Sequence, residues 1–351
     1  MNTNPVLVEA WRGNSVESFH RGGFVVLDAQ GHVVASAGDI ERPVFPRSAI
    51  KLLQALPLIE SGAADRFALS ADELALACAS HGGEAMHTRT AASMLAKAGL
   101  DAGVLECGAH WPFDEPAKLA LAAAGATPGA LHNNCSGKHA GFACLGCVMA
   151  GAREPRAFLS GYVDAAHPVM REVGAAIEAA TGWRLADAPR ATDGCSIPTY
   201  AIPLRHLALA FARVAGGSGL SAGHATAARR LREAIAAAPF MVGGTGRFDS
   251  RVMAQFGTRV CCKVGAEGVY CAALPEAGLG VALKMDDGNT ARAAEVVMAA
   301  LLQALVAPRS DADAALLAEL AAPRLSNWRG LEVGRLAPHE QLRQAAKRAP
   351  A

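Results

Sequence analysis

Segments that favour β-strands occur near both ends of the chain, and a long stretch of helical pattern separates them. The N-terminal runs, residues 24–27 and 32–35, consist largely of β-branched and aromatic residues around a turn. Three runs at 259–263, 268–272 and 280–284 repeat the pattern and are separated by short glycine-containing turns. The simplest arrangement pairs the strands from both ends of the chain in one antiparallel sheet, which the helices cover. The expected class is therefore α+β.

The middle of the chain, residues 48–257, has mainly helical periodicity. Ser70 and Glu73 form a capping-box pattern, and Pro57 predicts a kink or a break between two short helices. Further helices are expected at 91–100, 141–150, 169–180, 204–214, 226–237 and 290–305.

These patterns predict one domain over residues 1–351. Its sheet region would comprise residues 6–47 and 258–305, followed by a polar, alanine-rich tail at 306–351. The chain has no β–α alternation of the Rossmann or barrel type and no repeat of fixed period.

Charge and hydrophobicity exclude several classes of protein. The 33 basic and 32 acidic residues leave a net charge of +1, which argues against a nucleic-acid or anionic-membrane binder. No uninterrupted apolar run reaches the ~18 residues of a transmembrane helix. Residues 1–5 lack the cationic and apolar regions of a secretory signal, and nine irregularly spaced cysteines favour reduced thiols. We therefore expect a cytoplasmic protein.

The first candidate for chemistry is Ser48-Ala49-Ile50-Lys51 at the start of a helix. Residues three apart lie on one helical face, so the Lys51 amine can approach the Ser48 hydroxyl. A serine hydroxyl becomes a nucleophile when a base removes its proton, and an uncharged lysine amine can do so. The same pattern also fits a capping serine followed by a solvated lysine.

Other polar clusters predict binding loops. Segment 80–84 (SHGGE) contains a glycine pair that permits close backbone approach to a ligand, although a helix end and turn would look the same. Segment 133–141 (NNCSGKHAG) resembles a loop that leads into a helix, without the residues of a phosphate-binding P-loop. Cys135 and Cys195 are too far apart in sequence for a standard zinc knuckle, yet the fold could bring them together. Cys144 and Cys147 are expected to be packed in a helix.

Taken together, the motifs resemble the Rhizobium-type (class 3) L-asparaginase family, also called the asparaginase II family. The resemblance covers about residues 6–305. It is carried in order by 47–51 (RSAIK), 80–84 (SHGGE), 133–139 (NNCSGKH), 193–196 (DGCS), 243–247 (GGTGR) and 263–268 (KVGAEG).

The resemblance implies a serine β-lactamase and penicillin-binding-protein-like fold, hydrolysis of L-asparagine to L-aspartate and ammonia, and a homodimer. Ser48 would be the nucleophile and Lys51 its base, while Ser80 and Lys263 would form a second serine–lysine pair. The remaining implied residues are the zinc ligands Cys135, Lys138 and Cys195 and the substrate-binding candidates Arg47, His139 and Asp193.

One departure from the family pattern is Val264, which stands where a threonine would supply a hydroxyl. Two other functions stay open at this point. One is another serine–lysine acyl hydrolase, such as a glutaminase or a β-lactamase-like enzyme. The other is a zinc- or ligand-binding protein without turnover, in which Ser48 only caps a helix.

Overall fold

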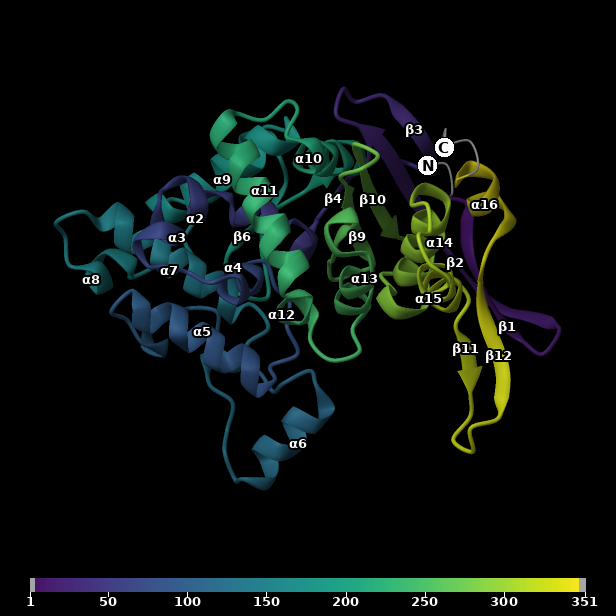
Figure 1. Cartoon of the computed structure of the whole chain (residues 1–351), viewed down its shortest axis with the longest axis horizontal. Helices are drawn as coiled ribbons and strands as arrows, with labels where there is room; N and C mark the ends of the chain where they lie inside the picture. Colours follow the sequence, from purple (N-terminus) through teal and green to yellow (C-terminus); the bar gives the residue numbers. More distant parts are fainter. Residues whose placement is uncertain (1–3, 347–351) are drawn as a thin grey trace. The chain divides into compact units, whose positions relative to one another are not determined.

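The computed structural model describes residues 4–346, which form two compact units (Figure 1). Unit 1 combines the chain up to residue 49, residues 201–219 and the chain from residue 262. Unit 2 combines residues 50–200 and 220–261.

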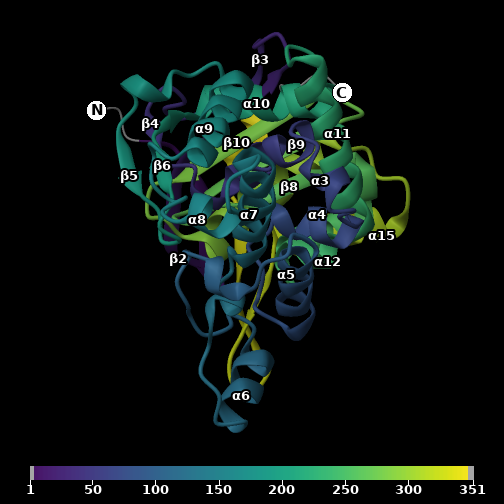
Figure 2. The same ribbon diagram turned by 90° about the vertical axis from the view of Figure 1, so that its left-hand side faces the viewer.

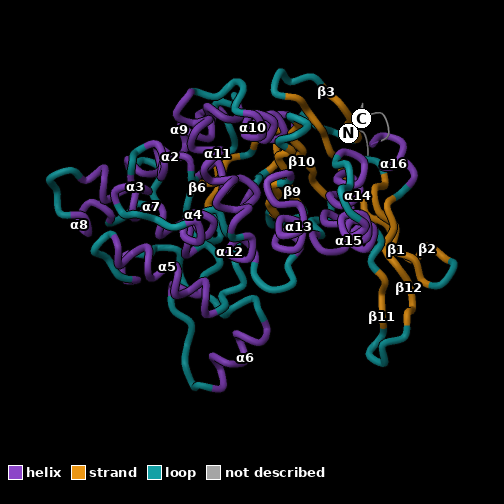
Figure 3. The backbone as a smooth tube through the Cα atoms, in the orientation of Figure 1, coloured by secondary structure: helices purple, strands orange, loops and turns teal. Residues whose placement is uncertain are grey.

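Unit 1 is built on an eight-stranded sheet with the order β11-β12-β1-β2-β10-β9-β8, and β3 pairs with β2 beside this path (Figure 3). The register pairs that link β1, β2, β3, β9, β10, β11 and β12 are antiparallel. The strands are β1 (Val6–Arg12), β2 (Ser15–Asp28), β3 (Val33–Ala37), β8 (Cys261–Val264), β9 (Val269–Leu274), β10 (Leu279–Met285), β11 (Arg324–Ser326) and β12 (Glu332–Pro338).

Strand β2 holds the sheet together because its two halves have different partners. Its first half pairs with β1, and its second half pairs with β10 and with β3. Residues 24–27 in this second half are completely buried, as expected for a central strand covered on both faces. The predicted N-terminal hairpin and the predicted sharing of one sheet by the two ends of the chain are confirmed.

Helix α10 (Leu204–Gly216) packs on β2, β9 and β10, although it lies in the part of the sequence predicted to be the helical region. The approach requires a glycine, since a Cβ at Gly280 would lie 2.1 Å from the carbonyl oxygen of Ala208. The other helices of unit 1 are α14 (Glu295–Leu305), α15 (Asp311–Ala321) and α16 (Glu340–Ala346). Unit 1 also contains β4 (Pro43–Val44) paired with β7 (Ile202–Pro203), the 3₁₀-helix η1 (Arg47–Ile50) and the short π-helix η6 (Thr290–Ala294).

Unit 2 is mainly helical and is organised around α7 (Ser136–Ala150), which is buried over most of its length (Figure 2). Helices α2, α3, α4, α5, α8 and α9 all pack against α7. The helices are α1 (Lys51–Gln54), α2 (Leu56–Glu60), α3 (Ala63–Arg66), α4 (Ala71–Ala77), α5 (Ala85–Lys97), α6 (Glu115–Ala123), α8 (Pro155–Leu159), α9 (Pro168–Thr181), α11 (Ala222–Ala237), α12 (Pro239–Gly243) and α13 (Phe248–Phe256). The 3₁₀ turns are η2 (Ala102–Val104), η3 (Ala130–His132), η4 (Leu185–Asp187) and η5 (Gly257–Arg259), and the hairpin β5 (Arg190–Thr192)–β6 (Pro198–Tyr200) completes the unit.

Two local predictions are confirmed in unit 2. Pro57 lies at the beginning of α2, and the helical segment is interrupted at Ala55 between α1 and α2. At the start of α4 the Glu73 amide donates to the Ser70 hydroxyl, and the Ser70 amide donates to the Glu73 carboxylate. Among residues 4–346, no helix is long and apolar enough to cross a bilayer.

Candidate functional site

A loop and the first turn of α7 bring several of the predicted site residues together. Asn133 shapes this loop, because its side-chain oxygen accepts from the Cys135 amide at 2.8 Å. The Asn133 side-chain amide donates to the Cys107 carbonyl, also at 2.8 Å. The following helix then carries Lys138 and His139 on its first turn, both of them buried. The segment therefore holds polar side chains in a dry, fixed arrangement.

Lys51 is completely buried, and its amine contacts three acceptors. Nζ donates to the carbonyl of Ala79, and it lies 3.0 Å from both the Ser80 hydroxyl and the Cys135 sulfur. An ammonium group has three N–H donors, so these contacts satisfy it fully. Lys51 is thus a buried amine in contact with a serine and a thiol, and the alternative of a solvated lysine is excluded.

Cys195 lies opposite Cys135 on the loop between β5 and β6. The amide of Ser196 closes a tight turn on the Asp193 carbonyl at 2.9 Å, and Ser196 adopts a left-handed φ of 76°. The Lys138 amine lies 3.0 Å from the Cys195 sulfur. Residues distant in sequence therefore form one buried cluster of two lysines and two cysteines, which we call the Lys/Cys cluster (Lys51, Cys135, Lys138 and Cys195).

The charges in the Lys/Cys cluster depend on one another. A hydrogen bond from Cys195, together with the Lys51 and Lys138 charges, holds the pKa of Cys135 well below its ordinary value despite burial. The same hydrogen bond, with burial, raises the pKa of Cys195. Burial alone would lower the pKa of Lys138, but the charges of Cys195 and Cys135 outweigh it and raise that pKa. The ionisation of each sulfur in the cluster therefore depends on the other sulfur and on the two neighbouring amines.

The predicted zinc ligands Cys135, Lys138 and Cys195 would offer two sulfur donors and one nitrogen donor, which are atom types that zinc accepts. Within residues 4–346 no group of three or more His, Cys, Asp or Glu side chains is placed to hold a metal. The predicted ligand set is of another kind, because its third member is a lysine. Two ligands of one tetrahedral zinc ion lie about 3.6 Å apart, so the 3.0 Å between Lys138 Nζ and Cys195 Sγ would lengthen by about 0.6 Å. Binding would also require Lys138 as a neutral amine and both sulfurs as thiolates.

Segment 80–84 is tied to the glycine-rich loop 243–247. The Ser80 amide donates to the Val242 carbonyl at 2.9 Å. The amide and hydroxyl of Thr245 donate to the two carboxylate oxygens of Glu84 at 2.9 and 2.7 Å. A Cβ at Gly244 would lie 2.4 Å from Glu84 Oε1. The loop thus braces the backbone on which Ser80 is carried.

Two residues around the cluster were missed in the sequence analysis as participants. His81 accepts at Nδ1 from the Gly83 amide, and its Nε2 lies 2.9 Å from the Ser136 hydroxyl at the start of α7. Burial lowers the pKa of His81 well below its ordinary value, so the ring is a neutral link between the two segments. Tyr162 contacts His139 Nδ1 with its hydroxyl at 2.6 Å. His81 lies in a recognised motif, whereas no sequence pattern marks Tyr162.

Arg47, Ser48 and Lys263 are described with unit 1. Ser48 is half-buried in η1, and the preceding Arg47 has a left-handed φ of 52°. The end of β8 lies against this turn, because a Cβ at Gly265 would be 2.7 Å from the Pro46 carbonyl oxygen and 3.2 Å from the Ala49 nitrogen. Lys263 is buried on β8 and donates to the Val264 carbonyl at 2.9 Å.

Two residues with a strained backbone lie beside predicted site residues. Non-glycine residues with positive φ are uncommon, and in residues 4–346 they are Arg47, Ala68, Ser196 and Glu267. Arg47 adjoins Ser48, and Ser196 adjoins Cys195. Strained conformations of this kind cluster at functional sites.

The structure therefore groups the predicted residues in two sets. Unit 2 brings together Lys51, Ser80 and the cluster sulfurs, and unit 1 brings the Ser48 turn against the end of β8. Ser48 lies in η1, and Lys51, three residues later, is the first residue of α1, which follows η1 directly in the chain.

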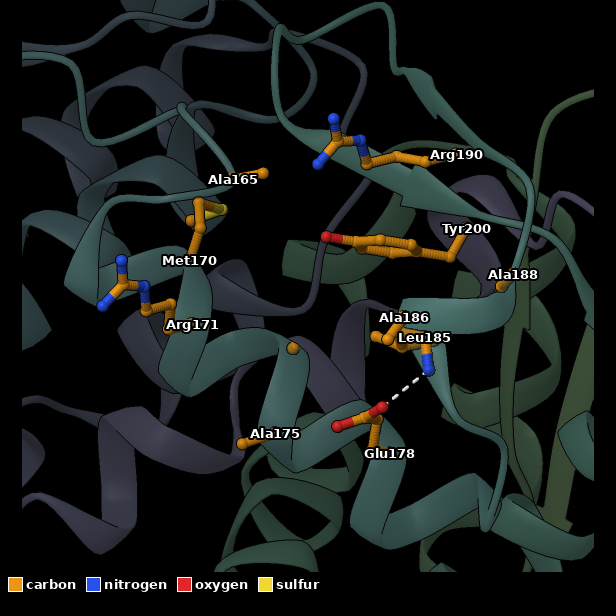
Figure 4. Close-up of a pocket in the computed structure, with 11 residues that line it drawn as sticks. Ala165, Met170, Arg171, Ala175, Glu178, Leu185, Ala186, Ala188, Arg190 and Tyr200 are labelled. Carbon is orange, nitrogen blue, oxygen red and sulfur yellow. Dashed lines mark hydrogen bonds between the residues drawn. The ribbon is translucent and has the colours of Figure 1, made fainter.

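An open groove elsewhere in unit 2 contains none of the predicted site residues. It has a volume of about 560 Å³ and lies between α9, the η4 segment and the β5–β6 hairpin. Tyr200 and Arg190 lie next to each other over this groove in Figure 4, as cross-strand partners do. We therefore place the candidate site at the Lys/Cys cluster and not in the groove.

Comparison with known proteins adds one match. The family model described as L-asparaginase II matches residues 8–338, which is nearly the whole chain. No curated protein matches the chain.

Proposed function

Because the chain belongs to the L-asparaginase II family, we propose that it is an amidohydrolase that converts L-asparagine to L-aspartate and ammonia. The structural observation that supports serine–lysine chemistry is the 3.0 Å contact between the buried Lys51 amine and the Ser80 hydroxyl. We further propose that the antiparallel sheet and the helical unit correspond to the β-lactamase-like fold expected for this family.

In the proposed reaction Ser48 attacks the side-chain amide carbon of the substrate, and the Lys51 amine takes the hydroxyl proton. For this role the amine must be uncharged when substrate binds. The C–N bond of the tetrahedral intermediate then breaks, the leaving nitrogen takes the proton from Lys51, and ammonia departs. Water attacks the resulting Ser48 ester, and Lys51 accepts the proton of the water. When the ester C–O bond breaks, Lys51 returns that proton to the Ser48 oxygen, and L-aspartate is released.

Ser80 and Lys263 support the proton transfers in this proposal. The Ser80 hydroxyl already accepts from Lys51, and the brace from loop 243–247 keeps its backbone in place. Lys263 lies on the strand whose end contacts the Ser48 turn, and we assign it to the same proton transfers as the partner of Ser80.

Cys135, Lys138 and Cys195 would hold zinc. When bound, the ion would supply a positive charge that neutralises the two thiolates.

Recognition of a free amino acid needs partners for its carboxylate and its ammonium group. We assign the cationic Arg47 and the donor His139 to the carboxylate and the anionic Asp193 to the ammonium group. Within residues 4–346 none of the nine cysteines forms a disulfide, which supports a cytoplasmic location for the enzyme. A homodimer remains a proposal from the family.

Ammonia release from purified protein tests this function. We expect turnover of L-asparagine, with little from L-glutamine and none of a chromogenic cephalosporin. Ser48→Ala and Lys51→Met should abolish it, whereas Lys118→Met, at an exposed lysine, should leave it unchanged. Full ammonia release by both site variants would overturn the catalytic assignment, and cleavage of the cephalosporin instead of asparagine would indicate a β-lactamase-like enzyme.

A further inference from the structure

His139 has one ring nitrogen paired and one unpaired, although its side chain is completely buried. Nδ1 lies 2.6 Å from the hydroxyl of Tyr162, which is also completely buried. Nε2 has no hydrogen-bond partner in the described part of the chain. A buried polar atom without a partner is costly and calls for an explanation, such as a ligand that completes it.

The hydrogen-bond network of Tyr162 determines what that nitrogen can do. The Tyr162 oxygen accepts from the Glu106 amide at 3.1 Å. A phenol has a single hydrogen to donate, and because the Tyr162 oxygen already accepts from Glu106, we assign that hydrogen to the contact with His139 Nδ1. With Nδ1 acting as acceptor, the proton of the neutral imidazole resides on Nε2. His139 therefore presents an N–H donor.

Tyr162 is itself held firmly. While the Glu106 amide donates to Tyr162, the Glu106 carboxylate accepts from the Gly161 amide at 2.7 Å, so the two segments brace each other. The neighbouring Cys107 carbonyl accepts from Asn133, which orients the amide of Cys135. One short segment, residues 106–107, thus positions both the His139 ring and the loop that carries Cys135.

We propose that Tyr162 is a positioning residue, which fixes His139 so that its Nε2–H points as a hydrogen-bond donor at the α-carboxylate that the proposed function assigns to it. The inference rests on the proposed function, in which Ser48 and Lys51 engage the side-chain amide. Of the two groups that remain on L-asparagine, the ammonium has no acceptor atom, whereas the carboxylate accepts from an N–H. Tyr162 and His139 would then select amides that carry an α-carboxylate.

The test compares two substrates in five proteins: wild type, Tyr162→Phe, Tyr200→Phe, His139→Gln and the double variant of His139→Gln with Tyr162→Phe. L-asparagine carries the α-carboxylate, and 3-aminopropanamide has the same amide and amine without it. We expect Tyr162→Phe to raise KM for L-asparagine about tenfold or more, the effect of losing a hydrogen bond to a charged group, with kcat little changed. The kinetic constants for 3-aminopropanamide should not change. Tyr200→Phe is the matched control, because this tyrosine lies over the groove of Figure 4.

The conservative variant His139→Gln places an amide N–H near the position of Nε2 without needing Tyr162. It should keep KM for L-asparagine near the wild-type value, and adding Tyr162→Phe to it should cause no further rise. Nitrogen-15 NMR of the His139 ring should show a single tautomer, with the proton on Nε2, in the wild-type protein. In Tyr162→Phe the ring should no longer be held in that one tautomer.

Several results would overturn the inference. Equal KM increases for both substrates, or an increase in Tyr200→Phe, would indicate a general structural effect. A fall in bound zinc with unchanged KM would place His139 at the metal and not at the substrate. Wild-type protein that releases no ammonia from L-asparagine would instead refute the proposed function, which separates the two failures.

Discussion

Gly137 provides a direct test of the packing that supports the Lys/Cys cluster. It lies in the first turn of α7, next to Lys138, and a Cβ there would be 2.4 Å from both the side chain and the carbonyl oxygen of Leu76. Leu76 belongs to α4, the helix that precedes Ala79 and Ser80. Gly137→Ala should therefore push the start of α7 away from the segment that carries Ser80.

The magnitude follows from the distances. The contact with the Leu76 carbonyl must lengthen by at least about 0.6 Å to reach the 3.0 Å that real Cβ atoms observe. Overpacking against backbone costs about 3 kcal/mol, and the better helix propensity of alanine returns about 1 kcal/mol. We expect Gly137→Ala to lower the free energy of unfolding by about 2 kcal/mol.

Gly141→Ala is the matched control, because it makes the same change one turn later in the same helix. Its Cβ would meet Ala77 and Leu58 side-chain carbons at 3.4 Å, which is an ordinary contact. The free energy of unfolding of this variant should rise by up to about 1 kcal/mol. Urea unfolding of the two variants should therefore show a difference of about 3 kcal/mol in their free energies of unfolding.

The functional consequence is measured by ammonia release under conditions where both variants are folded. Since a displacement of about 1 Å at a site can cost about 100-fold in rate, Gly137→Ala should lose about tenfold or more, and Gly141→Ala should retain activity. Equal stability and equal activity of the two variants would refute the packing argument.

Three further predictions concern the zinc site, the start of α4 and the brace on Ser80. If the proposed zinc site exists, Cys135→Ala and treatment of the wild-type protein with a chelator should both remove the ion, whereas Cys147→Ala should keep it; metal analysis that finds no zinc in the wild-type protein would remove the metal assignment. Burial alone would raise the pKa of Glu73, but hydrogen bonds from Lys97 and Ser70 hold it below the ordinary 4.5. Its stabilisation is therefore complete above pH 4.5 and disappears as the pH falls through the lower folded value, so the cost of Glu73→Gln in urea unfolding, about 1–2 kcal/mol, should shrink in acid. A cost independent of pH would contradict this. Glu84→Ala removes two hydrogen bonds from loop 243–247 and should lower kcat about tenfold through Ser80, and an unchanged kcat would show that the brace is dispensable.

The sequence predicted elements whose physical signals are local. The capping box at Ser70, the break near Pro57 and the hairpin around residues 28–31 each depend on a few neighbouring residues, and each is confirmed. The common sheet of the two chain ends could be predicted from β-propensity and position alone. Local pattern and composition were sufficient for this much.

The remaining features depend on contacts between residues far apart in sequence. Helix α10 has the same amphipathic pattern as its neighbours, and only the close approach at Gly280 reveals that it packs on the sheet. Residues 306–346 looked like a polar tail, yet they contain α15, β11, β12 and α16, because short strands among charged residues carry a weak signal. Tyr162 likewise stands in no motif, since its role depends on meeting His139 and Glu106.

The candidate site was predicted as residue types, and its arrangement was not. The pairing of Ser80 with Lys263 that the family resemblance implies stays a prediction, and the contact of Ser80 with Lys51 had no signal in the sequence. The proximity of Lys51 to Cys135 could not be predicted, because it depends on how α1 and the loop before α7 meet. The opposite pKa shifts of Cys135 and Cys195 likewise depend on the contact between these two distant residues in the folded chain.

The order of strands in the sheet has a consequence for how the protein is made. Strand β1, near the start of the chain, pairs with β12, and β2 pairs with β10, so these partners are translated hundreds of residues apart. While the intervening segment is translated, the edges of the β1–β2 hairpin stay unpaired. Unpaired strand edges promote aggregation. Slow elongation or a premature stop near residue 306 would therefore leave a nascent chain that depends on chaperones.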